Sequence, residues 1–491
     1  MLTDFRFRRV ALLSLPLALS ACGLPDLGAR PDIRTPASLD SDQTLAGATG
    51  PGAIALRPGQ EWPRQDWWRT YGDPQLDALV AEGLAGSPDV AAAQARIRQA
   101  RGAAQVAGAP LVPQIGGQGS AGAAKQSYNN GIPSDFVPKG WQSRGDLALT
   151  GDFDLDLWGR NRKLLAAATS EAEATRADAE QARLLVATNI VSSYFDLARL
   201  IERGRALEEA VAARGELEAL TRRLAQEGIE NQGPVRQSQA NTAQARIALA
   251  ANREQIAARR NALAALLGAG PDRGLTIQPG ALGAVESTPL PADAGIALAG
   301  RRPDIVAARL RVEAAGKRVD VGETAYLPDI SLRGLIGLTS LGLSNLFDGG
   351  SSYGSAGAAV SLPIFDGGRI RGRYRQTRGA FDLAVADYNA VVVDALRDIA
   401  DAVASREAAH EQERDAAQAR EDAGAAYDIA LKRYRGGLSS YIEALSAQQA
   451  ALDARVAAVD AHFRTLASEV ALKRALGGGY AEQTSEKVAV Q

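Results

Sequence analysis

The chain carries an internal duplication, which constrains its fold more than any other feature. Three pairs of short matches share one offset of 209 residues: Gly159-Arg160 with Gly368-Arg369, Glu227-Gly228 with Gly436-Gly437, and Leu267-Gly268 with Leu476-Gly477. Because the offset is constant, about 110 residues of the two copies align without insertion. A solenoid unit has only about 20–50 residues. The sequence therefore predicts two copies of one large structural module.

Two long tracts without proline lie at equivalent places in the copies. The chain has no proline between Pro138 and Pro234, and none after Pro363. Residues 160–226 and 369–434 are rich in Ala, Arg, Glu, Gln and Leu, which are strong helix formers. A helix of about 65 residues would be about 100 Å long, whereas helices in globular domains average about 11–12 residues. These tracts are predicted to be coiled-coil-like rods. A Gly-containing turn and a returning helix are expected after each rod, over 234–267 and 439–476.

A segment with a different period precedes each rod. Between residues 144 and 158, apolar side chains alternate with polar ones that include Asp152, Asp154 and Asp156. This period of two is typical of a β-strand with one apolar and one polar face. Transmembrane β-strands take about 9–11 residues, although soluble hairpins on a helical bundle would show the same alternation. If the strands cross a membrane, we expect the three aspartates to line the lumen and favour cations. Strands are predicted at about 114–124, 144–158, 329–340 and 353–364.

Four strands cannot close a membrane barrel within one chain. Single-chain barrels begin at about eight strands, and an open sheet edge in lipid leaves backbone groups without hydrogen bonds, at several kcal/mol each. A membrane barrel would therefore need several copies of the chain. Two copies would supply eight strands and three would supply twelve.

The N-terminus has the pattern of a bacterial lipoprotein signal. Residues 1–21 combine basic residues, an apolar run and a small-residue cleavage point, and Cys22, the only cysteine, follows at the position of a lipidated residue. Lipidation of Cys22 is therefore expected. The predicted organisation is a signal peptide at 1–21, a lipidated tether at 22–60, repeats at 61–280 and 281–480, and a tail at 481–491.

Composition argues against several classes of function. The net charge is −2 at pH 7, and no basic stripe with interleaved aromatic residues indicates nucleic-acid binding. The two histidines, His410 and His462, lie in helical, charge-rich sequence, and no metal-ligand constellation can be assembled. We expect no enzyme activity, no cofactor and no metal.

Several motifs in fixed order resemble one family. They are Trp67-Trp68, Tyr71-Gly72-Asp73-Pro74-Gln75-Leu76, residues 153–160 and 363–369, the Lys432–Gly437 turn and Ala475-Leu476-Gly477-Gly478-Gly479. Across residues 60–480 the chain resembles the outer membrane factors of bacterial tripartite pumps, which are TolC-like outer membrane efflux proteins. It is most similar to the lipoprotein branch that serves RND-type efflux.

The resemblance implies an α+β membrane protein and a homotrimer. Each protomer would give four strands to a twelve-stranded β-barrel in the outer membrane, joined to a long α-helical coiled-coil barrel in the periplasm. It also implies a lipid-anchored, non-catalytic duct that exports small molecules such as drugs. Its partners would be a periplasmic adaptor protein, an inner-membrane RND transporter and outer-membrane lipid.

The family closes its periplasmic tip with inward residues on the helix after the second turn. By this resemblance the apolar constriction residue is Ile442, while Ser446 and Gln449 stand where relatives usually carry an aspartate and an arginine. Glu443 is a candidate for the missing negative ring, and a solvated helix-face residue is an equal alternative.

Two alternatives to drug efflux are weighed. One is an outer-membrane channel of type I protein secretion, which would have the same shape. The other, from a different class, is a periplasmic structural lipoprotein rod, which needs no alternating strands.

Overall fold

The computed structural model describes residues 26–36, 39, 62–129, 131–280, 291 and 298–482. The chain divides into two units, each built from separate stretches of sequence. The first contains residues 1–32, 97–174 and 309–387, and the second contains residues 33–96, 175–308 and 388–491.

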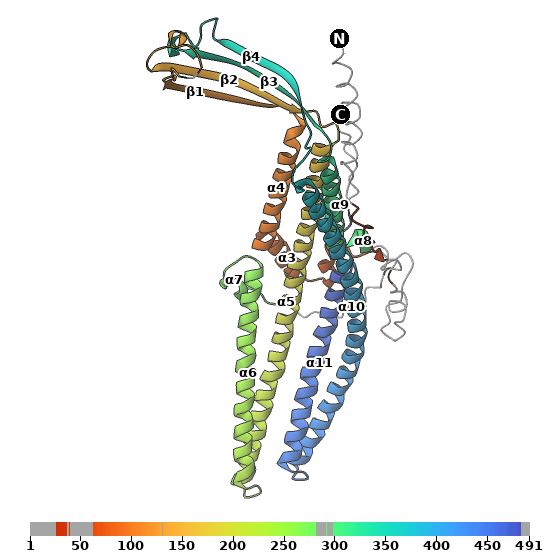
Figure 1. The fold of residues 1–491 in the computed structure, drawn as a ribbon. Coiled ribbons are helices and arrows are strands. Elements are labelled where there is room, and N and C mark those ends of the chain that lie inside the picture. Colours follow the sequence, from red (N-terminus) through yellow and green to blue (C-terminus); the bar gives the residue numbers. More distant parts are fainter. Residues whose placement is uncertain are drawn as a thin grey trace. The chain divides into compact units, whose positions relative to one another are not determined.

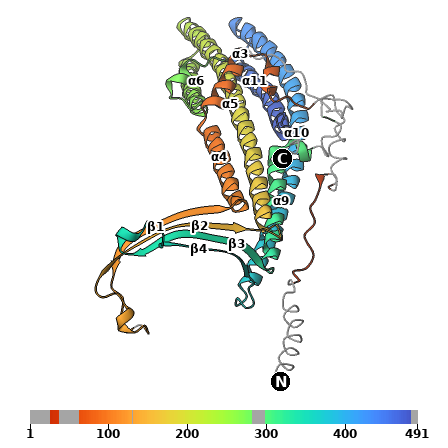
Figure 2. The same ribbon diagram turned by 90° about the horizontal axis from the view of Figure 1, so that it is seen from above.

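The first unit holds a four-stranded antiparallel sheet in the order β1-β2-β3-β4. In Figures 1 and 2 the sheet is one curved layer, and within the described residues no helix covers either of its faces. The four predicted strands are confirmed, and among the described residues the outer edges of β1 and β4 have no partner strand. Their bounds are Gln114–Ala124 for β1, Gln142–Asp154 for β2, Asp329–Leu341 for β3 and Ser352–Ser361 for β4.

One face of the sheet is apolar and exposed. In the register, Leu147 lies opposite Leu338, and Leu149 lies opposite Ile336. These residues share a face because successive side chains on a strand point to opposite sides. Leu149 and Ile336 are both exposed in the single chain. An apolar face without protein cover matches the lipid-facing side of a membrane barrel.

The second unit contains two helical hairpins, α5–α6 and α10–α11 (Figure 1). The long helices are α5 (Arg160–Gln226) and α10 (Arg369–Arg435), and both begin in the first unit. Both have 67 residues, and their starts and ends differ by the offset of 209. The returning helices α6 (Gln232–Leu266) and α11 (Tyr441–Ala475) have 35 residues each and the same offset. The structure therefore confirms the predicted duplication. The remaining α-helices of the described residues are α3 (Pro74–Gly86), α4 (Pro88–Gly108), α7 (Asp272–Leu275), α8 (Leu298–Arg301) and α9 (Pro303–Thr324).

The aromatic motif near residue 67 anchors the core of the second unit. Trp67 is buried, and the ring of Tyr71 meets that of Phe195 edge-on at 4.9 Å. Asp73 caps α3 by accepting from the backbone N–H of Gln75 at 2.8 Å, and it also accepts from the hydroxyl of Tyr194 at 2.5 Å. The motif that carried the family resemblance therefore has a structural role here.

Glycine is required at equivalent places after the two returning helices. Gly268 (φ +74°) approaches the carbonyl of Gly86, and Gly477 (φ +84°) approaches the carbonyl of Arg301. A Cβ atom would lie 2.3 Å and 2.0 Å from these carbonyl oxygens, respectively. Backbone therefore packs on backbone in the same way in both copies.

A buried ion pair joins α10 to α11. Arg406 and Glu469 are 0% and 1% exposed, and the Arg406 Nε lies 2.5 Å from the Glu469 Oε1. One turn further, the Lys473 ammonium donates to the Thr70 hydroxyl at 2.7 Å and lies 4.5 Å from the centroid of the Tyr71 ring. Burial lowers the pKa of Lys473 to about 8, while the charge of Glu469 opposes this shift.

Replacing one member of the buried pair leaves the other charge uncompensated. We expect Arg406→Met to reduce the free energy of unfolding by about 3–5 kcal/mol, and Arg406→Met/Glu469→Leu to recover most of that loss. Thermal unfolding in detergent measures both. Arg414→Met is the matched control, because Arg414 and Asp415 form an exposed pair whose removal should cost about 1 kcal/mol or less. A double variant as unstable as the single one would contradict this account.

The lowered pKa of Lys473 predicts a pH effect with a defined sign. The folded-state value of about 8 lies below the ordinary 10.5, so the unfolded chain binds more protons between these values. Stability then rises with pH across this window. We expect the melting temperature of the wild type, relative to Lys473→Met, to increase from pH 8 to 9.5. A constant difference between the two proteins would show that the charge of Glu469 keeps Lys473 charged throughout.

Candidate functional site

The polar face of the sheet carries charges of both signs. Asp152 and Asp154 of β2 lie on this face, as predicted for a strand of period two. Arg333 of β3 lies directly opposite Asp152, with its Nε 3.4 Å from the Asp152 Oδ1, and the two side chains are 70% and 61% exposed. Nearby, the hydroxyl of Tyr353 donates to the Asp146 Oδ2 at 3.2 Å. Because Arg333 pairs with Asp152, the charge of this face is more balanced than the aspartates alone suggest.

Asp156 contradicts the prediction made for it. Strand β2 ends at Asp154 rather than near residue 158, and Asp156 has a positive φ of 43°. Its carboxylate is 9% exposed and accepts from the backbone N–H groups of Asn161 at 2.8 Å and Arg162 at 3.1 Å. Asp156 therefore caps the start of α5 instead of presenting its charge to a lumen.

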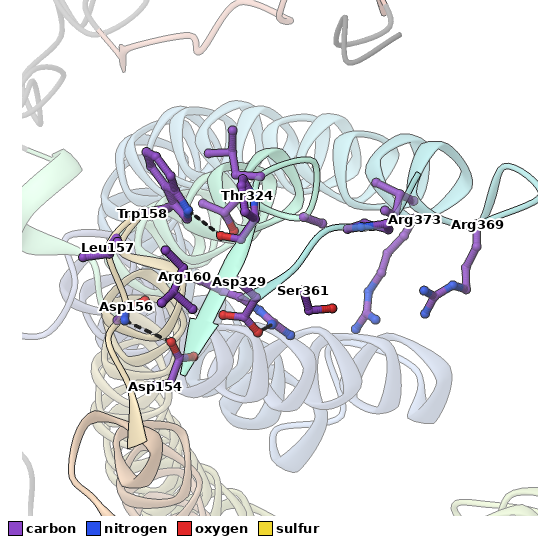
Figure 3. A pocket seen from close by; sticks show the side chains of 16 residues that line it. Asp154, Asp156, Leu157, Trp158, Arg160, Thr324, Asp329, Ser361, Arg369 and Arg373 are labelled. Atoms are coloured by element: carbon purple, nitrogen blue, oxygen red, sulfur yellow. Dashed lines mark hydrogen bonds and ion pairs between the residues drawn. The ribbon is translucent and has the colours of Figure 1, made fainter. Parts of the chain in front are cut away.

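A pocket of about 280 Å³ lies where the strands meet the long helices (Figure 3). The Trp158 indole N–H donates to the carbonyl of Pro328 at 2.7 Å, and the Arg160 Nη1 lies 4.0 Å from the Asp329 Oδ2. These contacts join the connection between β2 and α5 to the start of β3 and thus join the two copies. The described residues contain no group of three or more His, Cys, Asp or Glu that could hold a metal.

The four predicted gate residues lie at the start of α11. Ile442, Ser446 and Gln449 are exposed and spaced by four and three residues, which places them on one helix face. Glu443 is also exposed and lies in the first turn, where its backbone N–H donates to the capping hydroxyl of Ser440 at 3.3 Å. A carboxylate in the first turn stabilises a helix through the helix dipole, so Glu443 has a structural role as well.

Polar contacts link the two hairpins near their turns. The Tyr434 and Thr221 hydroxyls are 3.2 Å apart, and the Asn241 amide donates to the Tyr441 hydroxyl at 3.1 Å. Burial is the main cause that raises the pKa of both tyrosines, which therefore remain neutral at physiological pH.

An arginine adds a third link between the hairpins, and it uses a predicted gate residue. The Arg214 Nη2 donates to the Gln449 Oε1 at 2.5 Å, and its Nη1 donates to the Asn241 carbonyl at 3.0 Å. Sequence reasoning found Gln449 but missed Arg214 and the two tyrosines. The sequence did contain a signal for these contacts. Tyr434 and Tyr441 flank the second turn, whereas the first copy has Ala225 and Gln232 at the equivalent positions.

The comparisons with known proteins agree with this geometry. The chain matches the family described as outer membrane efflux protein over residues 79–269 and 297–478, so one matched segment lies in each copy. The chain belongs to this family. Membership favours a channel over the periplasmic rod, and the predicted Cys22 anchor lies outside the described residues.

Among relatives, the chain is 30% identical to the multidrug resistance outer membrane protein MdtP of Escherichia coli over 346 residues, covering 69% of this chain and 71% of MdtP. It is 34% identical to the fusaric acid resistance protein FusA of Burkholderia cepacia, covering 63% of this chain and 59% of FusA. The match thus spans less than two thirds of the length of FusA.

Solved structures extend the likeness to nearly the whole chain. The outer membrane protein VceC of Vibrio cholerae is 37% identical with a TM-score of 0.79, and the match covers 85% of this chain and all of VceC. The CmeC outer membrane channel of Campylobacter jejuni is 26% identical with a TM-score of 0.84, covering 94% and 95%. The fold is therefore that of an outer-membrane channel.

Proposed function

We propose that this chain is the outer-membrane channel of a tripartite RND-type efflux pump. The observation that carries the proposal is a four-stranded sheet with one exposed apolar face and one polar face, in a chain of the outer membrane efflux family. The apolar face meets lipid and the polar face lines a water-filled lumen. The channel is a passive duct that performs no chemistry.

The working form is a homotrimer. Strands β1 and β4 each have one edge without a partner among the described residues, and such edges are not tolerated in lipid. Pairing β4 of one protomer with β1 of the next satisfies both edges, and three protomers give twelve strands. The resemblance supports three copies rather than two.

The transported compounds are small toxic molecules. MdtP is named for multidrug resistance and FusA for fusaric acid resistance, which support this substrate class. Energy comes from an inner-membrane RND transporter, reached through a periplasmic adaptor that docks on the helical hairpins. The chain is held at the outer membrane by a lipid on Cys22 as well as by its strands, and its helices extend into the periplasm.

Ile442 is predicted to restrict the periplasmic end of the channel. It is exposed in the single chain although it is apolar, as a constriction facing a narrow lumen would be. We expect Ile442→Ala to raise the single-channel conductance in planar bilayers severalfold. Ile247→Ala is the matched control, because Ile247 is similarly exposed on α6 and should leave conductance unchanged. Equal conductance in the wild type, Ile442→Ala and Ile247→Ala would show that Ile442 does not restrict the channel.

The mass of the purified protein in detergent tests the rest of the proposal. We expect three chains per particle, each lacking residues 1–21 and carrying acyl groups on Cys22. A monomer that forms no pore would contradict the channel function. A full-length chain without acyl groups would contradict the lipid anchor alone.

The Asp152–Arg333 pair predicts two opposite changes in ion selectivity. Asp152→Asn leaves Arg333 uncompensated on the polar face, so we expect the cation-to-anion permeability ratio to fall. Arg333→Gln frees Asp152, so the ratio should rise. Asp156→Asn is the control, because this buried cap should reduce thermal stability by about 1 kcal/mol without changing selectivity. Reversal potentials in a salt gradient measure all three, and an unchanged ratio in both pair variants would place the pair away from the lumen.

A further inference from the structure

The start of α10 is strongly basic. Five arginines occur within ten residues from Arg369 to Arg378, and no Asp or Glu lies between them. Four of them are exposed, and none of these four forms an ion pair with another described residue. They are Arg369, Arg371, Arg373 and Arg375.

Helical geometry divides the four exposed arginines between two faces. Arg369 and Arg373 are four residues apart and line the pocket of Figure 3 with the aspartates of β2 and β3. Arg371 and Arg375 are also four residues apart, and they do not line that pocket. These two continue along the helix towards buried Arg378 and form a separate stripe.

Apolar residues precede this stripe. Val360 is the last residue of β4 on the apolar face of the sheet, and it is exposed. Ile364 and Phe365 follow and are each 92% exposed. Apolar and aromatic side chains next to arginines are typical of the boundary between hydrocarbon and lipid head groups.

The N-terminal segment lies beside the same stripe. The Arg378 Nη2 donates to the carbonyl of Ala29 at 2.7 Å, and the Arg30 guanidinium lies 5.5 Å from the centroid of the Phe381 ring. Cys22 lies seven positions before Ala29, and seven residues span at most about 25 Å. A lipid on Cys22 must therefore enter a bilayer surface within that distance of Arg378.

We propose that Arg371 and Arg375 bind the phosphate groups of anionic phospholipids in the periplasmic leaflet of the outer membrane. The inference rests on the proposed membrane location and lipid anchor. Arg371 lies about 10 Å along the helix from Arg378, which is within reach of the bilayer surface defined by the tether. Arginine suits this role because its planar guanidinium forms paired hydrogen bonds with phosphate oxygens. The stripe sets the depth of the sheet in the membrane at the point where the strands end.

The experiment titrates full-length protein in a non-ionic detergent with fluorescent phosphatidylglycerol, read as anisotropy. We expect Arg371→Gln/Arg375→Gln to weaken binding roughly thirtyfold, since each basic residue near an anionic surface contributes about 1 kcal/mol. Arg369→Gln/Arg373→Gln is the matched control with the same change of charge on the other face, and it should bind within about twofold of wild type. Arg371→Lys/Arg375→Lys keeps the charge and should retain most of the binding.

Several outcomes would overturn the proposal. They are wild-type affinity in Arg371→Gln/Arg375→Gln, an equal loss in Arg369→Gln/Arg373→Gln, or displacement of the probe by an equal concentration of inorganic phosphate. A changed number of protomers in Arg371→Gln/Arg375→Gln would instead assign the stripe to the contact between copies. Pore conductance is measured separately on the same proteins. If the wild-type protein binds the lipid but forms no pore, the proposed channel function is wrong and the lipid site is still supported.

Discussion

The requirement that backbone groups in lipid form hydrogen bonds determines the design of this protein. In the sheet order β1-β2-β3-β4, the backbone groups of the two inner strands are hydrogen-bonded on both sides. Among the described residues, one edge of β1 and one edge of β4 have no partner strand. Water could hydrogen-bond these edges, but lipid cannot. The apolar face of the sheet is exposed, so transfer to water would also be unfavourable. In the proposed membrane location, pairing of these edges with further copies of the chain would satisfy both conditions.

The long helices are subject to a different constraint, because the apolar seam along which they pack is narrow. An Ala-rich seam buries little area per turn, and burial contributes about 25 cal/mol per Å², so the hairpins need additional contacts. The structure supplies them near residue 67, where aromatic rings pack on α5, and at Arg406 and Glu469, which join α10 to α11. Such a buried pair adds little net stability compared with an apolar pair.

The sequence was most informative where a pattern was long and uninterrupted. The rods at 160–226 and 369–434 were predicted to within one residue, because proline-free helical sequence between glycine turns leaves few alternatives. The end of β2 was missed because Asp156 continues the alternation while its backbone has already left the strand. The pairing of Asp152 with Arg333 depends on the register between two strands 180 residues apart, which neither strand defines alone. The hairpin links were missed for the same reason, since Arg214 meets Gln449 only after both hairpins have formed.

The two copies match in the lengths of their long and returning helices, but they differ in the side chains at their turns. The second hairpin supplies Tyr434 and Tyr441, which reach Thr221 and Asn241 of the first hairpin. At the equivalent positions the first copy has Ala225 and Gln232, so the contacts cannot be reciprocal. The first turn is followed by Pro234, and the second turn contains no proline, so the second hairpin has fewer backbone restraints of its own. Movement of the second hairpin would break these tyrosine contacts without unfolding either helix. The duplication therefore provides two hairpins of similar length. They differ at their turns, where Tyr434 and Tyr441 of the second hairpin form hydrogen bonds with the first.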